Sequence, residues 1–411
     1  MKHVWILNHY ALEPGGAGGT RHYHLAEHLP VHGWCASILA ASVEHNGGRQ
    51  RLGTREKYRI ETFGSGDIPF LWIRAPQYKG NGRGRMLNML AYTWRVLLPV
   101  STRGLEKPDA VIGSSVHPFA ALAGALLARR HRVPFVFEVR DLWPQTLIDL
   151  GRIGNNSPTA RSMRALERWL YRKADRIVTL LPHVADYIHQ FGVSRSKVVW
   201  IPNGVELSGF PDPGPPTLKQ DQPFVLMYLG SHGQANGLEN ILKAMKLLQD
   251  SGDAGRLQLR MIGDGPAKAG LQHFAERLNL HNVSFESPVP KSCVPDLASQ
   301  ADAFILSVLN RPNLYRYGIS MNKMYDYFAG RRPIVMASAA INDPVRDAGA
   351  GLTVPPEDPA ALAAAVKELM AMSVEERDRM GRAGRNYVEI HNDFGVLAKD
   401  LADVLNDCAQ M

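Results

Sequence analysis

The sequence predicts an α/β fold in which two Rossmann-like, doubly wound domains face each other across a cleft. Three observations support this prediction. Short runs rich in Val, Ile and Phe alternate with helix-length amphipathic segments, the 411 residues suffice for two hydrophobic cores, and prolines concentrate near the middle of the chain. Open parallel sheets bind ligands beyond the carboxyl ends of their strands, so we expect the active site in the cleft.

The expected strands are the short apolar runs. In the first half they are residues 2–8, 36–41, 109–114, 134–139, 176–181 and 197–201. In the second half they are residues 224–229, 257–262, 283–286, 303–308 and 333–337. Segment 208–223 contains five prolines and two glycines, which interrupt helices and strands, so we interpret it as a linker between domains 1–207 and 224–389.

The composition argues against several classes of protein. The cysteines, Cys35, Cys293 and Cys408, are odd in number and lack metal-ligand spacing, so a disulfide framework or a zinc site is not indicated and a reducing cytoplasm fits best. The first apolar run is shorter than a signal peptide requires, and no run approaches the roughly 20 residues that cross a bilayer. We therefore expect a soluble or peripheral cytoplasmic protein.

Charge is distributed unevenly along the chain. Residues 1–205 carry 27 Lys and Arg against 14 Asp and Glu, a net +13, whereas residues 206–411 carry a net −5. The basic half predicts an acidic partner. Nucleic acid, anionic lipid and a diphosphate-bearing substrate all satisfy this requirement. The electrostatic field of the protein distinguishes partners by the sign of their charge and not by their chemical class.

A glycine-rich string, PGGAGGTRHYHLAEHL at 14–29, follows the first expected strand. Gly16, Gly18 and Gly19 allow close backbone approach, and the following helix offers free N–H groups to an anion, with Arg21 in its first turn. The spacing is neither the dinucleotide fingerprint nor a Walker loop. A plain strand-to-helix turn is the alternative.

Two strings in the second half also place polar groups after strands. In GDGPAK, Gly263 and Asp264 end a strand and Lys268 lies within reach of a phosphate, although the turn has a sufficient structural explanation. In RYGISMNKMYDYFAGRRPIV at 316–335, free N–H groups at residues 321–323 would face a diphosphate. Asp326, one turn on, could accept hydrogen bonds from ribose hydroxyls or be a solvated helix residue.

His117 lies in GSSVHPFAAL, on the loop between a strand and a helix that starts at Pro118. There it could donate a hydrogen bond to a leaving phosphate or a sugar hydroxyl, or it could be a partly buried loop residue. Nearby, FEVRDLWP places Glu138, Arg140 and Asp141 at another strand end.

Together these strings make the whole chain resemble the family-4 retaining glycosyltransferases of the GT-B fold. Within them it resembles the group that transfers N-acetylated deoxy-sugars such as N-acetyl-L-fucosamine in O-antigen or capsule assembly. The strings are GGTRHYHLA, FEVRDLWP, GSHGQANGLENIL from Gly230 onwards, and YGISMNKMYDYFAGRRPIV. The resemblance implies a UDP-sugar donor bound mainly by the second domain and an acceptor-binding first domain. It also implies that a C-terminal helix, near residues 390–411, crosses back onto the first domain.

The resemblance implies a role for each matching residue. His117 matches the family's cleft histidine and is the expected catalytic residue. The expected donor-binding residues are Gly16, Gly18, Gly19, Arg21, Arg140, Gly230, Gly263, Asp264, Lys268, Tyr317, Gly318, Met321, Asn322, Lys323 and Asp326. The implied acceptor is a polyprenyl-diphosphate-linked or lipid A-core saccharide of lipopolysaccharide synthesis.

The chain departs from the family pattern at two places. Gly318 stands where the first of two loop glutamates is expected, and Asp326 replaces the second. His232 and Asn236 replace an expected arginine and lysine. Other groups must then neutralise the diphosphate, and the candidates are Lys323, Arg21, Arg140 and Lys268. The resemblance implies front-face retention without a metal or other cofactor, and no Asp-x-Asp string occurs.

Residues 83–98 form an amphipathic segment with a polar stripe at Arg85, Asn88, Tyr92 and Arg95. Its wide apolar face either packs on the sheet or lies in the membrane interface, with the arginines on lipid phosphates. The basic first half favours the inner face of the cytoplasmic membrane. Two other classes stay open: a nucleic-acid binder, for which no reader motif is present, and a sugar-nucleotide epimerase, which would have no use for this segment.

Overall fold

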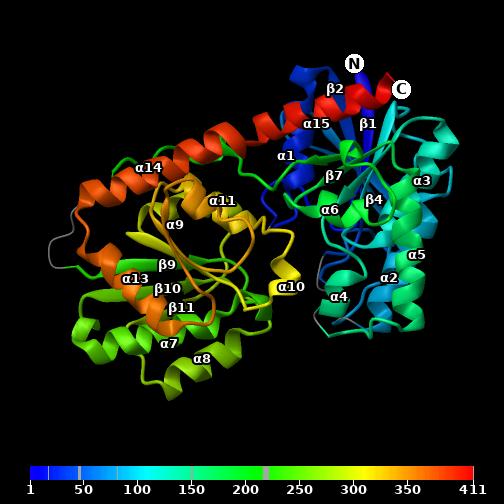
Figure 1. Cartoon of the computed structure of the whole chain (residues 1–411). Coiled ribbons are helices and arrows are strands. Elements are labelled where there is room, and N and C mark those ends of the chain that lie inside the picture. Colours follow the sequence, from blue (N-terminus) through cyan, green and yellow to red (C-terminus); the bar gives the residue numbers. More distant parts are fainter. Residues whose placement is uncertain (17, 45–47, 81, 150, 216–221, 411) are drawn as a thin grey trace. The chain divides into compact units, whose positions relative to one another are not determined.

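The computed structural model describes the chain except residues 17, 45–47, 81, 150, 216–221 and 411. It divides into two units, Met1–Pro202 with Phe394–Met411, and Asn203–Asp393 (Figure 1). Each unit is built on one sheet with helices on both faces. The predicted α/β architecture of two Rossmann-like units is confirmed.

The sheet of the first unit has the order β3-β4-β2-β1-β5-β6-β7-β8, and β3 alone among these runs antiparallel to its neighbour. Its strands are β1 (Lys2–Leu7), β2 (Trp34–Ala41), β3 (Tyr58–Phe63), β4 (Ile68–Ile73), β5 (Ala110–Ser114), β6 (Phe135–Val139), β7 (Arg176–Thr179) and β8 (Val198–Trp200). In register, Val4 of β1 lies between Ala36 of β2 and Ala110 of β5. Strands β1, β2 and β5 are almost wholly buried, as their continuous apolar runs predict.

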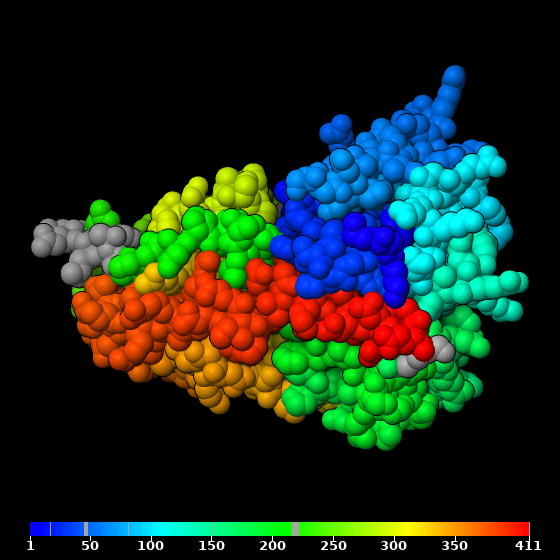
Figure 2. Space-filling view, turned by 90° about the horizontal axis from the view of Figure 1, so that it is seen from above, coloured from blue at the N-terminus to red at the C-terminus, as the bar shows by residue number. Residues whose placement is uncertain are grey.

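Helices cover both faces of this sheet. They are α1 (Arg21–His28), α2 (Arg83–Val96), α3 (Pro118–His131), α4 (Gln145–Asp149), α5 (Pro158–Lys173), α6 (Val184–His189) and α15 (Phe394–Ala409). Helix α15 lies along α1, and in Figure 2 the red atoms of the C-terminal segment lie against the blue atoms of the N-terminal elements. Phe394, Leu397, Leu401 and Leu405 recur at helical spacing and enter the core beneath α1. Helices α2 and α3 pack against each other, with α3 against β1, β5 and β6.

The second unit has a parallel sheet of order β11-β10-β9-β12-β13-β14. Its strands are β9 (Phe224–Leu229), β10 (Leu257–Ile262), β11 (Val283–Glu286), β12 (Ala303–Ser307), β13 (Ile334–Ala337) and β14 (Gly351–Val354). Its helices are α7 (Leu238–Leu248), α8 (Lys268–Arg277), α9 (Val294–Ser299), α10 (Pro312–Tyr315), α11 (Asn322–Ala329), α12 (Pro344–Asp347), α13 (Pro359–Ala371) and α14 (Val374–His391). One core lies under α7, α8 and α13 and the other under α9, α11 and α14.

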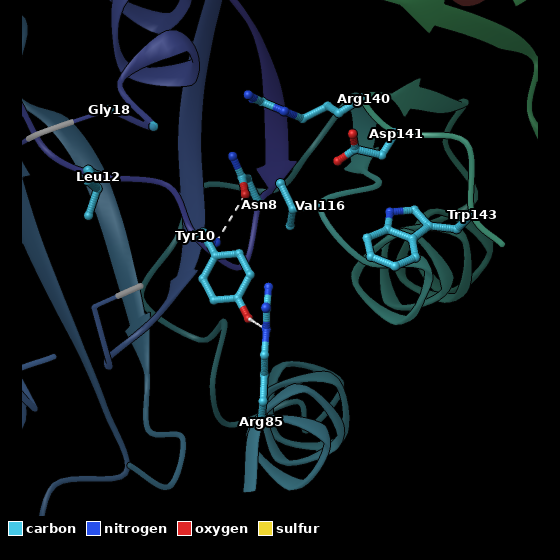
Figure 3. A pocket seen from close by; sticks show the side chains of 10 residues that line it. Asn8, Tyr10, Leu12, Gly18, Arg85, Val116, Arg140, Asp141 and Trp143 are labelled. Carbon is cyan, nitrogen blue, oxygen red and sulfur yellow. Dashed lines mark hydrogen bonds between the residues drawn. The ribbon is translucent and has the colours of Figure 1, made fainter. Parts of the chain in front are cut away.

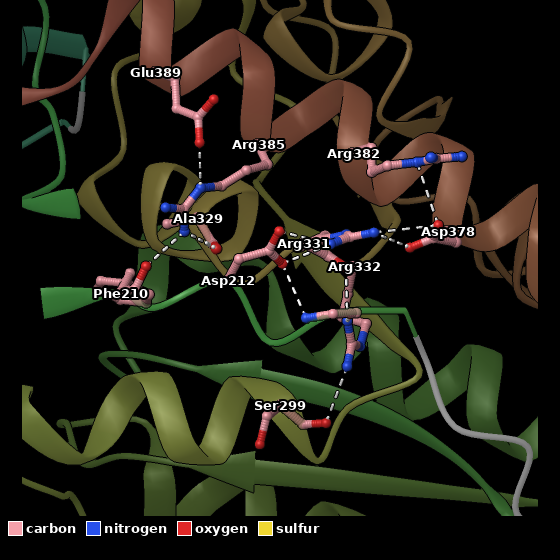
Figure 4. Close-up of polar contacts among 11 residues, drawn as sticks. Phe210, Asp212, Ser299, Ala329, Arg331, Arg332, Asp378, Arg382, Arg385 and Glu389 are labelled. Atoms are coloured by element: carbon pink, nitrogen blue, oxygen red, sulfur yellow. Dashed lines mark hydrogen bonds and ion pairs between the residues drawn. The ribbon is translucent and has the colours of Figure 1, made fainter. Parts of the chain in front are cut away.

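The described part of the proline-rich segment belongs to the second unit. The boundary between the units falls after Pro202, earlier than the linker predicted at 208–223. Phe210 is buried in the core under α11, and Asp212 pairs with Arg331, which also pairs with Asp378 of α14 (Figure 4). Residues 216–221 of the predicted linker lie outside the described residues.

Every predicted strand is present, but three further strands were not predicted: β3, β4 and β14. None of the described helices is both long enough and apolar enough to cross a membrane.

Candidate functional site

A pocket of about 360 Å³ opens in the first unit at the carboxyl ends of β1, β5 and β6 (Figure 3). The segments after these three strands and helix α2 supply its lining. The lining residues are Asn8, Tyr10, Leu12, Gly18, Gly19, Arg85, Val116, Arg140, Asp141 and Trp143. The structure thus brings together Gly18, Gly19 and Arg140 of the predicted site.

Two guanidinium groups and the carboxyl group of Asp141 are the ionisable groups of opposite sign that line the pocket. Arg85 comes from α2, donates from Nε to the hydroxyl of Tyr10 at 3.1 Å and lies 5.4 Å from the Tyr10 ring centroid. Arg140 follows β6, and its Nη1 is buried without a hydrogen-bond partner among the described residues. A buried donor without a partner is costly, so an oxygen-rich anion in the pocket would relieve that cost.

Trp143 supplies an apolar wall beside these charges. Its indole Nε1 donates to the carbonyl oxygen of Ser115 at 3.0 Å, which fixes the plane of the ring. A rigid aromatic surface next to a few charged groups is typical of a site for a small polar molecule such as a sugar.

The glycine-rich loop forms another wall of the pocket. Gly18 and Gly19 have φ of +86° and +72°, and a Cβ at Gly19 would lie 2.9 Å from the carbonyl oxygen of Tyr10. A larger residue at Gly19 would therefore be strained and would press on the segment that carries Tyr10. Gly16 packs against Leu12 and does not line the pocket.

Arg21 lies inside the first unit and does not line the pocket. Its Nε donates to Oε1 of Glu138 at 3.0 Å, and its terminal nitrogens donate to the carbonyl oxygens of Ile201, at 2.9 Å, and Pro202. His22 and Ser114 approach the other oxygen of Glu138, at 2.7 Å and 2.6 Å. Burial alone would raise the pKa of Glu138, but His22 and Arg21 lower that pKa well below its usual range. This network joins α1, β5, β6 and the end of β8.

His117 caps helix α3 and is 1% exposed. Its Nδ1 accepts a hydrogen bond from the backbone N–H of Ala120 at 3.2 Å, so the ring proton lies on Nε2 when the ring is neutral. Burial, and then the neighbouring His9 and Arg85, lower the pKa of His117 well below its usual value. Nε2 has no partner among the described residues, so the ring holds one unused donor at neutral pH.

The position of His117 follows from tight packing of α3 on β5. A Cβ at Gly113 would come 2.9 Å from the Cα of Ala121, so the helix lies directly on the strand. The ring of His117 makes edge contacts with His9 and Tyr10, at 4.7 Å and 6.2 Å between centroids. His117 is therefore a buried neighbour of the pocket, next to the lining residue Val116.

In the second unit, the turns after β9 and β10 pack backbone against backbone. A Cβ at Gly263 would lie 2.0 Å from the carbonyl oxygen of Gly230, and the backbone N–H of His232 donates to the carbonyl oxygen of Asp264 at 2.8 Å. These glycines therefore have a packing reason to be present. Lys268 donates to the carbonyl oxygens of Gly263 and Glu286, at 2.7 Å and 2.6 Å, so two of its three donors are used within the unit.

Lys323 lies in the first turn of α11 and reaches the turn after β9. Its Nζ donates to the hydroxyl of Tyr228 at 2.6 Å and to Oδ1 of Asn236 at 3.0 Å, and a Cβ at Gly230 would lie 3.2 Å from its Cε. Burial lowers the pKa of Lys323 to about 7. Burial, and then Lys268, lower the pKa of His232 to about 4, so this histidine is neutral beside Lys323.

The backbone N–H groups at the start of α11 have no side-chain cap, because Met321 at the N-cap position offers none. The preceding loop is fixed by other contacts: the backbone N–H of Ile319 donates to Oδ1 of Asn342 at 2.7 Å, and Gly318 has φ of +108°. Tyr317 is nearly buried, with the guanidinium of Arg316 over its ring. Met321, Asn322 and Lys323 are thus presented on one rigid element.

Asp326 is paired with Lys291 and is only partly exposed. The ammonium of Lys291 also lies 5.7 Å from the ring centroid of Phe210. A ribose at Asp326 would therefore share this carboxylate with Lys291.

Some residues of the site were not predicted. Asn8, Tyr10 and Trp143 line the pocket, and the signal that could have found them is their position directly after strands. The polar stripe of residues 83–98 includes Arg85, and of the two environments left open for that segment neither is a ligand pocket, yet the guanidinium of Arg85 faces the pocket.

Two Rossmann-like α/β units, each with polar groups beyond the carboxyl ends of its strands, have the architecture of the GT-B fold. The chain matches the Glycosyl transferase 4-like domain over residues 16–204 and the Glycosyl transferases group 1 over residues 223–372, one in each unit. The chain is a glycosyltransferase of the GT-B fold.

Two bacterial proteins are similar to it in sequence. It is 25% identical over 54% of its length to WcaI of Escherichia coli K12, named as a colanic acid biosynthesis glycosyl transferase, and the match spans 56% of that protein. It is 23% identical over 70% of its length to WbjE of Pseudomonas aeruginosa, named as a glycosyltransferase, and spans 73% of it.

Solved structures share the fold over nearly the whole chain. Sucrose-phosphate synthase of Thermosynechococcus elongatus has a TM-score of 0.73 at 16% identity, with 99% of each chain covered. HepE of Anabaena, solved with UDP and glucose, has a TM-score of 0.66 at 13% identity, again with 99% of each chain covered.

Proposed function

We propose that this glycosyltransferase transfers a sugar from a UDP-sugar to a lipid-linked saccharide with retention of the anomeric configuration, in the assembly of a surface polysaccharide. The names of the two bacterial relatives and the UDP bound by HepE support this proposal. The resemblance to N-acetyl-L-fucosamine transferases makes an N-acetylated deoxy-hexose the expected sugar.

The observation that carries the donor half of the proposal is the start of α11. Uncapped backbone N–H groups and the partly buried ammonium of Lys323 lie together there, next to the turn after β9. A helix N-terminus with an adjacent cation binds a diphosphate without a metal ion. We assign the UDP phosphates to residues 321–323 and the ribose hydroxyls to Asp326.

The acceptor half is assigned to the pocket of the first unit. Arg85 and Arg140 would hold the phosphates of a polyprenyl-diphosphate-linked or lipid A-core saccharide, and Trp143 would contact a sugar ring. The basic charge of the first half of the chain favours such an acidic acceptor.

In the proposed reaction, the acceptor hydroxyl attacks the anomeric carbon on the face from which UDP leaves. The bond between this carbon and the diphosphate oxygen breaks as the new glycosidic bond forms, and the acceptor proton passes to the departing diphosphate. Positioning and charge stabilisation are then the contributions of the protein. His117 would donate its Nε2 proton in a hydrogen bond to a sugar hydroxyl or to the leaving group.

The test is a transfer assay with the full chain, a panel of UDP-sugars and a short-chain lipid-diphosphate saccharide, with the product anomer read by NMR. Lys323→Met should weaken UDP binding in calorimetry by about tenfold or more, as expected for a lost charged hydrogen bond. Lys243→Met removes an exposed lysine of α7 in the same unit and is the matched control. An inverted product would refute the mechanism. Release of free sugar or isomerised nucleotide-sugar without transfer would favour the hydrolase or epimerase alternative.

A further inference from the structure

Helix α2 buries the side that carries Asn88 and Tyr92 and exposes an apolar stripe on the opposite side. Asn88 and Tyr92 are fully buried. The apolar residues of the opposite side are 44% to 69% exposed, and they are Met86 at 47%, Leu87 at 61%, Leu90 at 44% and Trp94 at 69%. The buried side is mixed, since it also contains Met89, Thr93 and Val96. The exposed apolar stripe is nevertheless unusual, because the outer face of a surface helix is normally polar.

Hydrogen bonds hold the polar side inward. Asn88 donates to the carbonyl oxygen of Pro76 at 2.7 Å, and its Oδ1 lies 2.7 Å from Nε2 of His9. The hydroxyl of Tyr92 donates to the carbonyl oxygen of Leu39 at 2.7 Å, which fixes the helix to β2. Rotating α2 to bury its leucines would leave these buried polar groups without partners, so the exposed apolar side is built into the unit.

The apolar side continues beyond the helix. Leu98 and Val100 in the following turn are also exposed. Leu87, Leu90, Trp94 and Leu98 are three or four residues apart, so the side chains form one stripe. A continuous exposed stripe of this kind marks an interaction surface, because single exposed apolar residues are common but clusters are not.

Basic residues surround this stripe. From Lys79 to Arg132 the chain contains nine Lys and Arg against two acidic residues, Glu106 and Asp109. Arg83 and Arg103 are exposed at the two ends of the stripe, and exposed Arg130 of α3 donates to the carbonyl oxygen of Leu97 at 2.6 Å.

We propose that the stripe Met86, Leu87, Leu90, Trp94, Leu98 and Val100 docks on the surface of an anionic phospholipid bilayer. The stripe would enter the interface between headgroups and acyl chains, with Trp94 at headgroup depth and Arg83, Arg103 and Arg130 on lipid phosphates. A second copy of the chain is disfavoured as the occupant, because two such basic surfaces would repel each other.

Helix α2 would then have a different function on each of two opposite sides. The role of membrane docking in sugar transfer rests on the proposed function. The outward side meets the bilayer, while Arg85 on the inward side lines the pocket assigned to the acceptor. A lipid-linked acceptor would then keep its chain in the bilayer while its phosphates reach Arg85.

The test is sedimentation of the full chain with vesicles of phosphatidylcholine containing about a quarter phosphatidylglycerol, and with phosphatidylcholine alone. We expect binding to the anionic vesicles that falls at high salt, and a loss of about tenfold or more in the double variant Leu87→Gln, Trp94→Gln. Ile390→Gln is the matched control, because Ile390 is 64% exposed on α14 of the other unit. Equal sedimentation of the double variant and the control would overturn the proposal.

Two further readouts separate the outcomes. If light scattering shows an oligomer that the double variant dissociates, a second copy occupies the stripe and the proposal is wrong. Transfer to a water-soluble acceptor analogue should be unchanged in the double variant, whose melting temperature should also match the parent. Failure of the parent itself to transfer any sugar would refute the proposed function and leave the vesicle result standing.

Discussion

UDP binding should weaken as pH rises above neutrality, because of Lys323. Burial lowers the pKa of this lysine to about 7, whereas a lysine in water has a pKa of about 10.4. In the free protein, the ammonium therefore loses its proton as pH rises through about 7. A diphosphate beside Nζ favours the charged form, so the complex takes up the proton that the free protein has lost.

The size of the effect follows from the lowered pKa. If UDP binds only the protonated form, the apparent Kd scales with one plus the ratio of neutral to charged lysine. The Kd should rise about 5-fold from about pH 7 to pH 8, and about 50-fold from about pH 7 to pH 9, for a free pKa of about 7. His232 has a pKa of about 4 and stays neutral across this range, so it contributes nothing to the change.

Calorimetry in two buffers with different ionisation enthalpies measures both the Kd and the proton uptake. The parent should take up close to one proton at about pH 8.5, whereas Lys323→Met should take up none and show a nearly flat Kd. Lys243→Met should behave as the parent. A parent Kd that is constant across the range would show that Lys323 keeps its charge or does not contact the diphosphate.

Three further variants test the other assignments. Asp326→Ala should weaken UDP binding by about 1.5–3 kcal/mol in calorimetry, since a charged hydrogen bond is lost. The control Lys291→Met should leave the affinity for UDP near the parent value. Equal affinity of both variants for UDP would show that Asp326 is not part of the site. Glu138→Gln should lower the free energy of unfolding by about 3–5 kcal/mol in urea titrations, because buried Arg21 is left without its counter-charge; an unchanged midpoint would contradict this. His117→Ala should lower kcat by about 100-fold with little change in KM, because one hydrogen-bond donor to the transition state is lost. His117→Asn should restore the melting temperature through the α3 cap but not kcat. Parental turnover in stable His117→Asn would show that the ring has no catalytic role.

Much of the fold could be predicted because central parallel strands are short apolar runs. Strands β1, β5 and β9 are examples, since burial on both faces requires apolar residues throughout. The unpredicted strands lie at or near sheet edges. β3 reads YRIETF and is only partly buried, and β14 has four partly buried residues, so neither shows the same continuous apolar run. β4 is a buried apolar run that could have been predicted.

The candidate site was predictable where residues directly follow strands. Gly18, Gly19 and Arg140 line one pocket for that reason. Arg21 also follows the glycine-rich loop, but its side chain turns inward to Glu138, and a one-dimensional motif does not specify this direction. The periodicity of residues 83–98 likewise identifies a stripe without saying which side is buried. Tertiary hydrogen bonds to Pro76 and Leu39 decide that question.

In the proposed donor site, the positive charge comes from a helix of the second unit and not from the loop after β9. The family resemblance expects a basic pair at His232 and Asn236, yet His232 is buried and neutral and Asn236 is uncharged. Oδ1 of Asn236 instead accepts a hydrogen bond from Lys323, so the ammonium lies against the position that a loop lysine would have occupied. On α11 this charge adds to the helix dipole and to the uncapped N–H groups of the same turn. The same packing lowers the pKa of Lys323, so the fixed position of its Nζ and the predicted sensitivity of UDP binding to pH have one structural cause.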